Sequence, residues 1–254
     1  MLVAFYLVGS AATKLKMQQK ENIGSEYKQQ EGRNVWQVLS NGGLPTALAV
    51  ALAIYTGVQT GDVPVGWAPA AGLLTWKMSA ALQGGILGYY ACCCGDTLAS
   101  ELGVLSSEQP RLITNFRPVR RGTNGGVTLF GTAASGAGGL LMGAIFYVAG
   151  LVAPHVRASG EMTAAAAGQT WLLWAGLALG LGGSLVDSIL GATVQYTGYD
   201  RTQGCVVGRP GEDVTHISGL ALLSNNLVNV VSAAVCSLAG ALLSVRMVML
   251  AHGV

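Results

Sequence analysis

Residues 122–156 read GTNGGVTLFGTAASGAGGLLMGAIFYVAGLVAPHV and contain no Asp, Glu, Lys or Arg. A helix needs about 20 apolar residues to cross the hydrocarbon core of a membrane, so this stretch is long enough to span one. The whole sequence has the same character, because 51% of its 254 residues are apolar and 10% are charged, against about 25% charged residues in soluble domains. The sequence therefore predicts an integral membrane protein.

Further spans follow from the same criterion. Four more stretches lack these charged residues, or nearly so: 34–61, 63–95 (interrupted by Lys77), 162–186 and 214–245. The apolar opening, residues 1–13, is about half a span long, and we interpret it as the end of a longer helix or as a short anchor. Because Gly and Ala are abundant, helices are favoured over a β-barrel. The predicted fold class is an all-α, polytopic helix bundle with five complete transmembrane helices and a partial N-terminal one, forming a single domain over 1–254.

Glycines four residues apart recur within the predicted spans. The pairs are Gly84 and Gly88, Gly139 and Gly143, and Gly176 and Gly180. This small-xxx-small pattern lets helix backbones approach closely. We favour packing within one chain over a dimer interface as its purpose.

The connecting segments divide into two unequal sets if the helices alternate in direction. Segments 14–33, 94–125 and 196–218 hold five, four and two of the Lys and Arg residues, which is 11 of the 14 in the chain. Positive charge marks the cytoplasmic side of a membrane, or the matrix or stromal side in an organelle. We therefore expect these loops to face the compartment that contains nucleotides, in an organelle or endomembrane. The net charge of +2 is too small and dispersed for nucleic-acid binding.

Three carboxylates are candidate catalytic residues. Asp96 and Glu101 lie in Gly95-Asp-Thr-Leu-Ala-Ser-Glu-Leu-Gly103, and Asp187 interrupts an apolar span. Ionisable groups within a membrane are costly and usually functional. Oxygen ligands of this kind suit Mg²⁺, which one or two carboxylates hold together with substrate phosphates, so Asp96 and Asp187 are the candidate metal ligands. The alternative for Asp96 is that it only caps a helix.

A second set of residues has the chemistry of a phosphate site. Arginines bind phosphate oxygens, and glycines before a helix let backbone N–H groups converge on one anion. The candidates are Arg111, Arg120, Arg121, Thr123, Asn124, Gly125, Gly126 and the loop residue His216. The alternative is an interfacial turn with positive-inside arginines, and for His216 a structural role.

Two asparagines of the last span complete the candidate site. Asn225 and Asn229 are four residues apart and therefore share one helical face. They are candidate ligands of a lipid headgroup, or alternatively hydrogen-bonding links between helices.

Several of these motifs together resemble a known family. In order, they are GDTLASELG (95–103), PRLIT (110–114), VRRGTNGGVT (119–128), GSLVDSILGATVQYTG (183–198) and NNLVN (225–229). They resemble the eukaryotic transmembrane protein 19 family, which includes plant and cyanobacterial phytyl-phosphate kinases of vitamin E biosynthesis. The similarity runs from about Ser25 to the last span.

The resemblance implies a polyprenyl-phosphate kinase. Such an enzyme transfers a phosphoryl group from a nucleoside triphosphate to an isoprenoid monophosphate such as phytyl or geranylgeranyl phosphate, with Mg²⁺. A more distant similarity to dolichol and phytol kinases implies CTP as the donor. Members of the family that the chain resembles usually carry Asp at the position of Ser224, and this departure motivates the alternative of a non-catalytic accessory subunit in a larger membrane complex. Both a homo-oligomer and a larger complex are compatible with the sequence.

Overall fold

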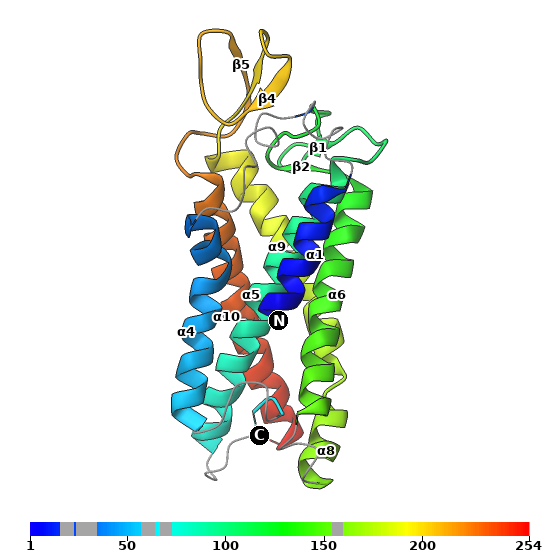
Figure 1. Ribbon diagram of the computed structural model, residues 1–254, viewed down its shortest axis with the longest axis vertical. Helices are drawn as coiled ribbons and strands as arrows, with labels where there is room; N and C mark the ends of the chain where they lie inside the picture. The colour runs from blue at the N-terminus through cyan, green and yellow to red at the C-terminus, as the bar shows by residue number, and fades with distance from the viewer. Residues whose placement is uncertain (16–22, 24–34, 57–63, 67–72, 154–159, 254) are drawn as a thin grey trace.

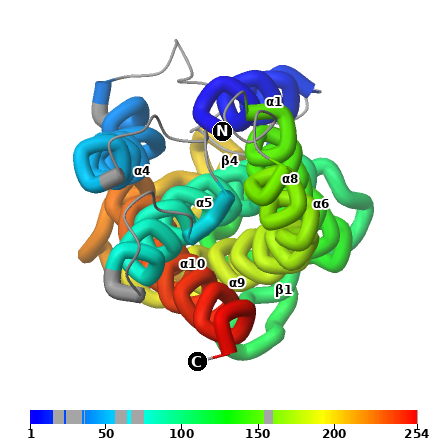
Figure 2. Tube along the Cα trace, turned by 90° about the horizontal axis from the view of Figure 1, so that it is seen from below, coloured from blue at the N-terminus to red at the C-terminus, as the bar shows by residue number. Residues whose placement is uncertain are grey.

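A long central helix organises the bundle. The computed structural model describes residues 1–15, 23, 35–56, 64–66, 73–153 and 160–253. Helix α5 (Leu73–Gly103) has 31 residues and is about 46 Å long at 1.5 Å per residue. The helices packed against it are α1 (Leu2–Lys14), α4 (Val35–Thr56), α6 (Leu129–Val152), α9 (Trp171–Val194) and α10 (Asn225–Ala251). Seen from the end, these helices surround α5 (Figure 2).

Four helices are long and apolar enough to span a membrane, among the residues that the structure describes. They are α6, α9, α10 and the Gln37–Tyr55 part of α4. The chain is therefore a polytopic helical membrane protein, but the expected count of five spans is not confirmed. Helix α5 has the length of a span, but it carries Lys77, Gln83, Asp96 and Glu101. A helix enclosed by others can hold polar residues that a lipid-facing helix cannot.

Two small sheets accompany the mainly helical bundle. Strands β1 (Arg111–Leu112) and β2 (Gly126–Val127) pair antiparallel. Strand β3 (Thr197–Asp200) lies between β4 (Cys205–Val207) and β5 (Val214–Ser218), and both pairings are antiparallel. Strands β1, β3, β4 and β5 lie in the segments expected to be loops, whereas β2 lies just after one of them, in the stretch 122–156. Figure 1 shows both sheets at the same end of the bundle.

Helix boundaries also differ from the charge-free stretches. The last helix begins at Asn225 rather than near 214, because Val214–Ser218 is recruited into the sheet as β5. Helix α6 begins at Leu129, where the Thr128 hydroxyl accepts a hydrogen bond from the Gly131 N–H at 3.0 Å. The stretch 162–186 is divided between the short helix α8 (Gly160–Ala167) and α9, which continues to Val194. A stretch without charged residues can lie within the membrane, but the residues at which its helix begins and ends are set by capping groups and glycines.

The glycine pairs pack helices within the chain, as predicted. A Cβ atom on Gly139 of α6 would lie 2.8 Å from the Cα atom of Gly180 in α9, and Gly88 of α5 adjoins the backbone of Cys236 in α10. Contacts this close require the absence of a side chain. The glycines therefore determine how α6 rests on α9 and α5 on α10.

Candidate functional site

A large cavity lies at the end of the bundle that carries the sheets. Its volume is about 1340 Å³, and its walls come from α1, α4, α5, α6, α9, α10 and the loop before α6. This exceeds the roughly 300–1,000 Å³ of a typical small-molecule pocket. The cavity is large enough for two substrates side by side.

Gly95 brings the Asp96 region of α5 against two other helices. A Cβ atom on Gly95 would lie 2.8 Å from the carbonyl oxygen of Gly180 in α9 and 2.9 Å from that of Ser135 in α6. Only glycine permits this approach, since real Cβ atoms do not come so close to backbone oxygens. The close packing leaves Asp96 on the cavity wall, together with Asp187 of α9.

Asp187 is held from one side by α10. The Ser232 hydroxyl donates to Asp187 Oδ2 at 2.9 Å. With the Asn229 amide oriented so that its nitrogen meets acceptors, it donates to the same Oδ2 at 3.2 Å and to the Asn225 carbonyl at 3.1 Å. These bonds occupy one carboxylate oxygen and leave Oδ1 without a hydrogen-bond partner among the described residues.

Asp96 and Asp187 are two neighbouring carboxylates, and neither forms an ion pair with a described residue. They are near enough for Asp187 to act electrostatically on Asp96. Within the described chain no hydrogen bond or ion pair to Asp96 is found. Two carboxylates with free oxygens facing one cavity fit a hard divalent cation such as Mg²⁺. No group of three or more His, Cys, Asp and Glu side chains that could hold a metal ion is found among the described residues, so a cation here would take its remaining ligands from substrate or water.

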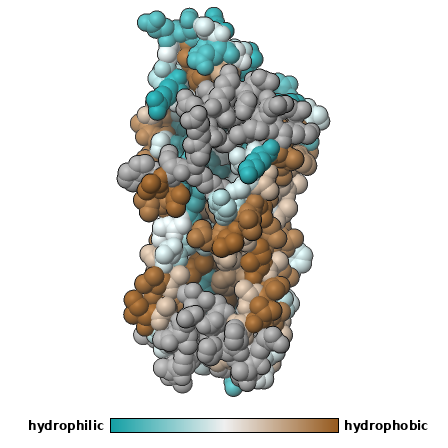
Figure 3. All heavy atoms as spheres, in the orientation of Figure 1, coloured by the Kyte–Doolittle hydropathy of each residue, from teal (hydrophilic) through white to brown (hydrophobic). Residues whose placement is uncertain are grey.

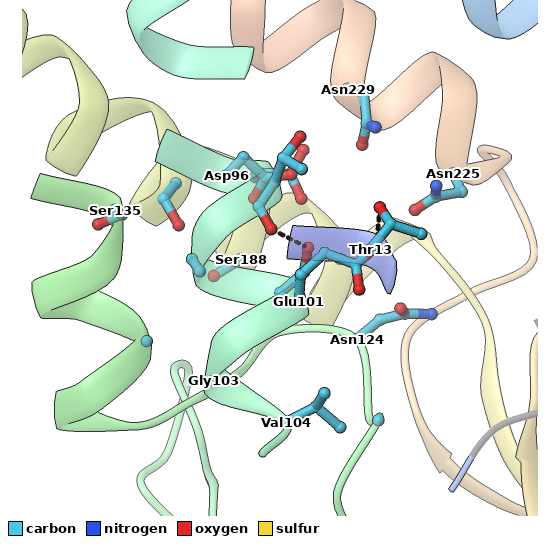
Figure 4. A pocket seen from close by; sticks show the side chains of 18 of the residues that line it. Thr13, Asp96, Glu101, Gly103, Val104, Asn124, Ser135, Ser188, Asn225 and Asn229 are labelled. Carbon is cyan, nitrogen blue, oxygen red and sulfur yellow. Dashed lines mark hydrogen bonds between the residues drawn. The ribbon is translucent and has the colours of Figure 1, made fainter. Parts of the chain in front are cut away.

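Glu101 connects α5 to the first helix. Its side chain is 8% exposed, and its Oε1 accepts a hydrogen bond from the Thr13 hydroxyl at 2.9 Å. Both residues line the cavity, as Figure 4 shows. Glu101 therefore also fixes the position of α1 on the cavity wall.

The asparagines of α10 lie on the same wall. Asn225 and Asn229 line the cavity, with Asn226 between them, and Figure 4 shows both side chains on the α10 side of the carboxylates. The Asn225 Oδ1 atom accepts from Gln195 Nε2 at 3.3 Å. The predicted headgroup residues and the predicted carboxylates thus meet in one place.

The Thr123–Gly126 loop reaches the cavity but uses most of its N–H groups internally. Thr123 N–H donates to the Arg120 carbonyl at 3.2 Å, and Gly126 N–H to the Thr123 carbonyl at 2.9 Å. Asn124 N–H donates to the Thr197 hydroxyl at 3.3 Å. The first N–H of α6, at Leu129, donates to Glu108 Oε2 at 2.9 Å. Two N–H groups of the loop therefore close the loop on itself and one holds it against β3, and these three are not directed at an anion in the cavity.

The predicted basic residues do not join the carboxylates. Arg111, Arg120, Arg121 and His216 are not among the described residues that line the cavity. Arg120 stacks on the Tyr199 ring, 3.8 Å from its centroid, and Arg111 Nη1 donates to the Phe116 carbonyl at 2.9 Å. The His216 imidazole contacts the Gly219 carbonyl at 2.8 Å. Arg120 and Arg111 thus stabilise the loops and sheets above the cavity.

Other polar residues of the cavity were not predicted. Lys14 at the end of α1 lines it and is, within the described part of the chain, its one basic side chain. The missed residues at the start of α6 and those around the predicted Asp187 in α9 share a spacing, because the cavity-lining positions in each segment recur at i, i+3, i+4 and i+7. The two sets are Thr128, Gly131, Thr132 and Ser135, and Ser184, Asp187, Ser188 and Gly191. A small or polar face of this period in an apolar span was the signal that could have revealed them.

Comparison with known proteins identifies a family model and several relatives that match most of the chain. The profile described as "Integral membrane protein DUF92" matches residues 1–237. Protein PGR of Arabidopsis thaliana is 42% identical over 235 residues, covering 91% of this chain and 76% of that protein. An uncharacterized membrane protein of Methanocaldococcus jannaschii is 28% identical over 198 residues, covering 78% and 65%.

A third relative matches a smaller part of the chain. "Protein VTE6, chloroplastic" of Arabidopsis thaliana is 30% identical over 134 residues, covering 53% of this chain and 35% of that protein. No solved structure matches the chain.

Proposed function

The chain belongs to the integral membrane protein family DUF92, as its resemblance to the transmembrane protein 19 family indicated, and from this premise we propose that it is a polyprenyl-phosphate kinase. The reaction transfers the terminal phosphoryl group of a nucleoside triphosphate, CTP by analogy, to an isoprenoid monophosphate. One observation carries the proposal. Asp96 and Asp187 share a single cavity, with oxygens that no described residue satisfies.

The chemistry needs charge neutralisation more than a general base. A phosphate monoester is largely dianionic at pH 7, because its second pKa is about 6. Its own oxygen can therefore attack the terminal phosphorus; a new P–O bond forms as the bond to the bridging oxygen of the donor breaks, and the products are an isoprenoid diphosphate and a nucleoside diphosphate. Phosphoryl transfer depends mainly on positioning and electrostatic stabilisation. A site without a cavity-facing histidine, within the described residues, is compatible with this reaction.

The charges of the cavity match this requirement only if a cation binds with the substrates. The described lining residues include three acids (Asp96, Glu101, Asp187) and one base (Lys14), a formal charge of −2. An acidic cavity repels phosphates, so Asp96 and Asp187 would hold Mg²⁺, which neutralises charge on the transferred group. Asn225 and Asn229 supply neutral polar groups for the acceptor headgroup.

A direct assay tests the proposal. Purified protein in liposomes is incubated with Mg²⁺, one labelled triphosphate at a time (CTP, ATP, GTP or UTP) and phytyl or geranylgeranyl phosphate. We expect labelled isoprenoid diphosphate in at least one combination and none when EDTA removes the metal. Absence of product with every donor and acceptor would refute the kinase.

Lys14 is expected to contribute to binding of the anionic substrates. Replacing it with Gln removes the one described positive charge on the wall, and a hydrogen bond to a charged group contributes about 1.5–3 kcal/mol. Because Lys14 is exposed, we expect the low end of this range, a rise in KM of about tenfold. Lys14→Arg should restore most of the affinity. The matched control is Lys77→Gln, a charge removal on α5 away from the cavity, and an equal effect there would contradict the role of Lys14.

One observation favours the accessory-subunit alternative. Ser224 lies on the cavity wall at the start of α10, at the position where the family resemblance implies an Asp, so a carboxylate would be replaced at the proposed site. This alternative predicts stable co-purification with a large membrane complex and no shift in melting temperature on adding Mg²⁺ with a nucleotide. A Ser224→Asp variant that gains transfer activity absent from the parent would identify the lost carboxylate as the cause.

A further inference from the structure

The cavity extends to the outer surface of the bundle between α1 and α4. Both helices pack against α5, and Figure 2 shows α4 to the left of α5 and α1 above it, apart from each other. We name the gap between them the seam. Its walls are Val3, Tyr6 and Ser10 of α1 and Gln37, Val38 and Asn41 of α4, all of which line the cavity.

The orientation of α1 shows that the seam is an opening and not a packed interface. The side of α1 that faces α5 carries Phe5, Gly9 and Ala12, which are buried. Val3 and Tyr6 also line the cavity, but they lie on another side of α1 and are 69% and 52% exposed. Across the gap, Val38 of α4 is 58% exposed. Side chains that line a cavity and are also exposed lie at its mouth.

Polarity changes along the path from the mouth to the carboxylates. Val3 and Val38 are apolar and exposed, whereas Ser10 and Asn41 on the same two walls are polar and half-buried. In Figure 3, paler and more hydrophilic surface is exposed between hydrophobic surfaces on this face of the bundle. Helices α1 and α4 approach each other at the start of α1, where a Cβ atom on Gly42 of α4 would lie 3.8 Å from Leu2 Cδ1.

We propose that the seam is the lateral portal through which the isoprenoid monophosphate enters from the membrane, its headgroup passing to Asp96 and Asp187 while its chain stays between α1 and α4. This inference rests on the proposed function. The occupant follows from the chemistry of the path: an anionic headgroup needs the polar interior, and a long hydrocarbon chain needs continuous contact with lipid. A triphosphate, which has no such chain, reaches the cavity from the aqueous end.

The test obstructs the seam without touching the polar site. The variant Val3→Trp with Val38→Trp places one bulky side chain on each wall at exposed positions. The matched control is Leu7→Trp with Leu39→Trp, since Leu7 and Leu39 lie on the same two helices, are 61% and 53% exposed and do not line the cavity. Each protein is assayed in liposomes with geranylgeranyl phosphate and with the water-soluble dimethylallyl phosphate.

We expect the seam variant to lose about tenfold in rate with the long acceptor, because access through the membrane is restricted. It should keep its rate with the short acceptor, while the control keeps both. Undiminished transfer to the long acceptor, or an equal loss with both acceptors, would overturn the portal. A parent protein inactive with both acceptors would instead overturn the kinase.

Photolabelling tests the portal independently of turnover. Geranylgeranyl phosphate with a diazirine on its last isoprene unit is irradiated with the parent protein in liposomes, and the labelled peptides are mapped. Label on residues 2–14 or 35–56 is expected, and its reduction in the seam variant but not in the control would support the portal. Label confined to other helices would overturn it, whether or not phosphate is transferred.

Discussion

Replacing Asp96 with Asn is expected to lower the rate of phosphoryl transfer by about 10²- to 10³-fold, the size of effect seen when one element of electrostatic stabilisation is removed from an active site. Asn is nearly the same size as Asp but cannot supply a negative oxygen to a divalent cation. The measurement is formation of labelled isoprenoid diphosphate at saturating Mg²⁺ and substrates. The same change at Asp187 should have a similar effect, because the two carboxylates share one cavity.

A stability measurement separates loss of metal binding from misfolding. Without metal, Asp96→Asn should be more heat-stable than the parent by about 1 kcal/mol, because it removes one of two neighbouring negative charges from the wall of one cavity. It should also lose the stabilisation that added Mg²⁺ gives the parent. Asp213→Asn is the control, since Asp213 is exposed and accepts from the Thr202 hydroxyl at 3.1 Å outside the cavity. A fully active Asp96→Asn protein would remove Asp96 from the mechanism.

The second large effect is expected from Gly139→Val, which should destabilise the folded protein by about 2–3 kcal/mol through overpacking. A Cβ atom at this position would lie 2.8 Å from Gly180 Cα and closer still to the Gly176 carbonyl oxygen. Because these are backbone atoms, they cannot move aside as a side chain can, and α6 and α9 must separate. The measurement is the melting temperature in detergent, together with transfer activity, which should fall as Asp187 on α9 moves relative to Asp96.

Gly150→Val is the matched control for Gly139→Val. Gly150 lies on the same helix, yet a Cβ atom there would have no neighbour within 4 Å. Both variants carry the same cost of a β-branched residue in a helix, so the difference between them reports interhelical packing. Equal melting temperatures for the two variants would show that the α6–α9 contact is unimportant for stability.

Several features could be predicted from the sequence because they depend on local properties. The stretch 122–156 identifies a membrane helix by its length and lack of charge, whatever surrounds it. The glycine pairs indicated close packing, since a missing side chain is visible in the sequence itself. Asp96 and Asp187 could be placed at one membrane level because depth follows from counting residues at 1.5 Å each along a helix.

Other features were decided only by the tertiary structure. Whether Asp96 and Asp187 face each other depends on the rotation of α5 and α9, which is set where Gly95 packs against Gly180. Lys14 lines the cavity because the Thr13–Glu101 hydrogen bond joins helices 88 residues apart in the chain. The arginines were predicted to bind phosphate from their charge and position, and only the tertiary structure shows that Arg120 lies over the Tyr199 ring. Hydropathy and helical rise determine how deep a residue lies, whereas the direction of its side chain depends on non-local packing and hydrogen bonds.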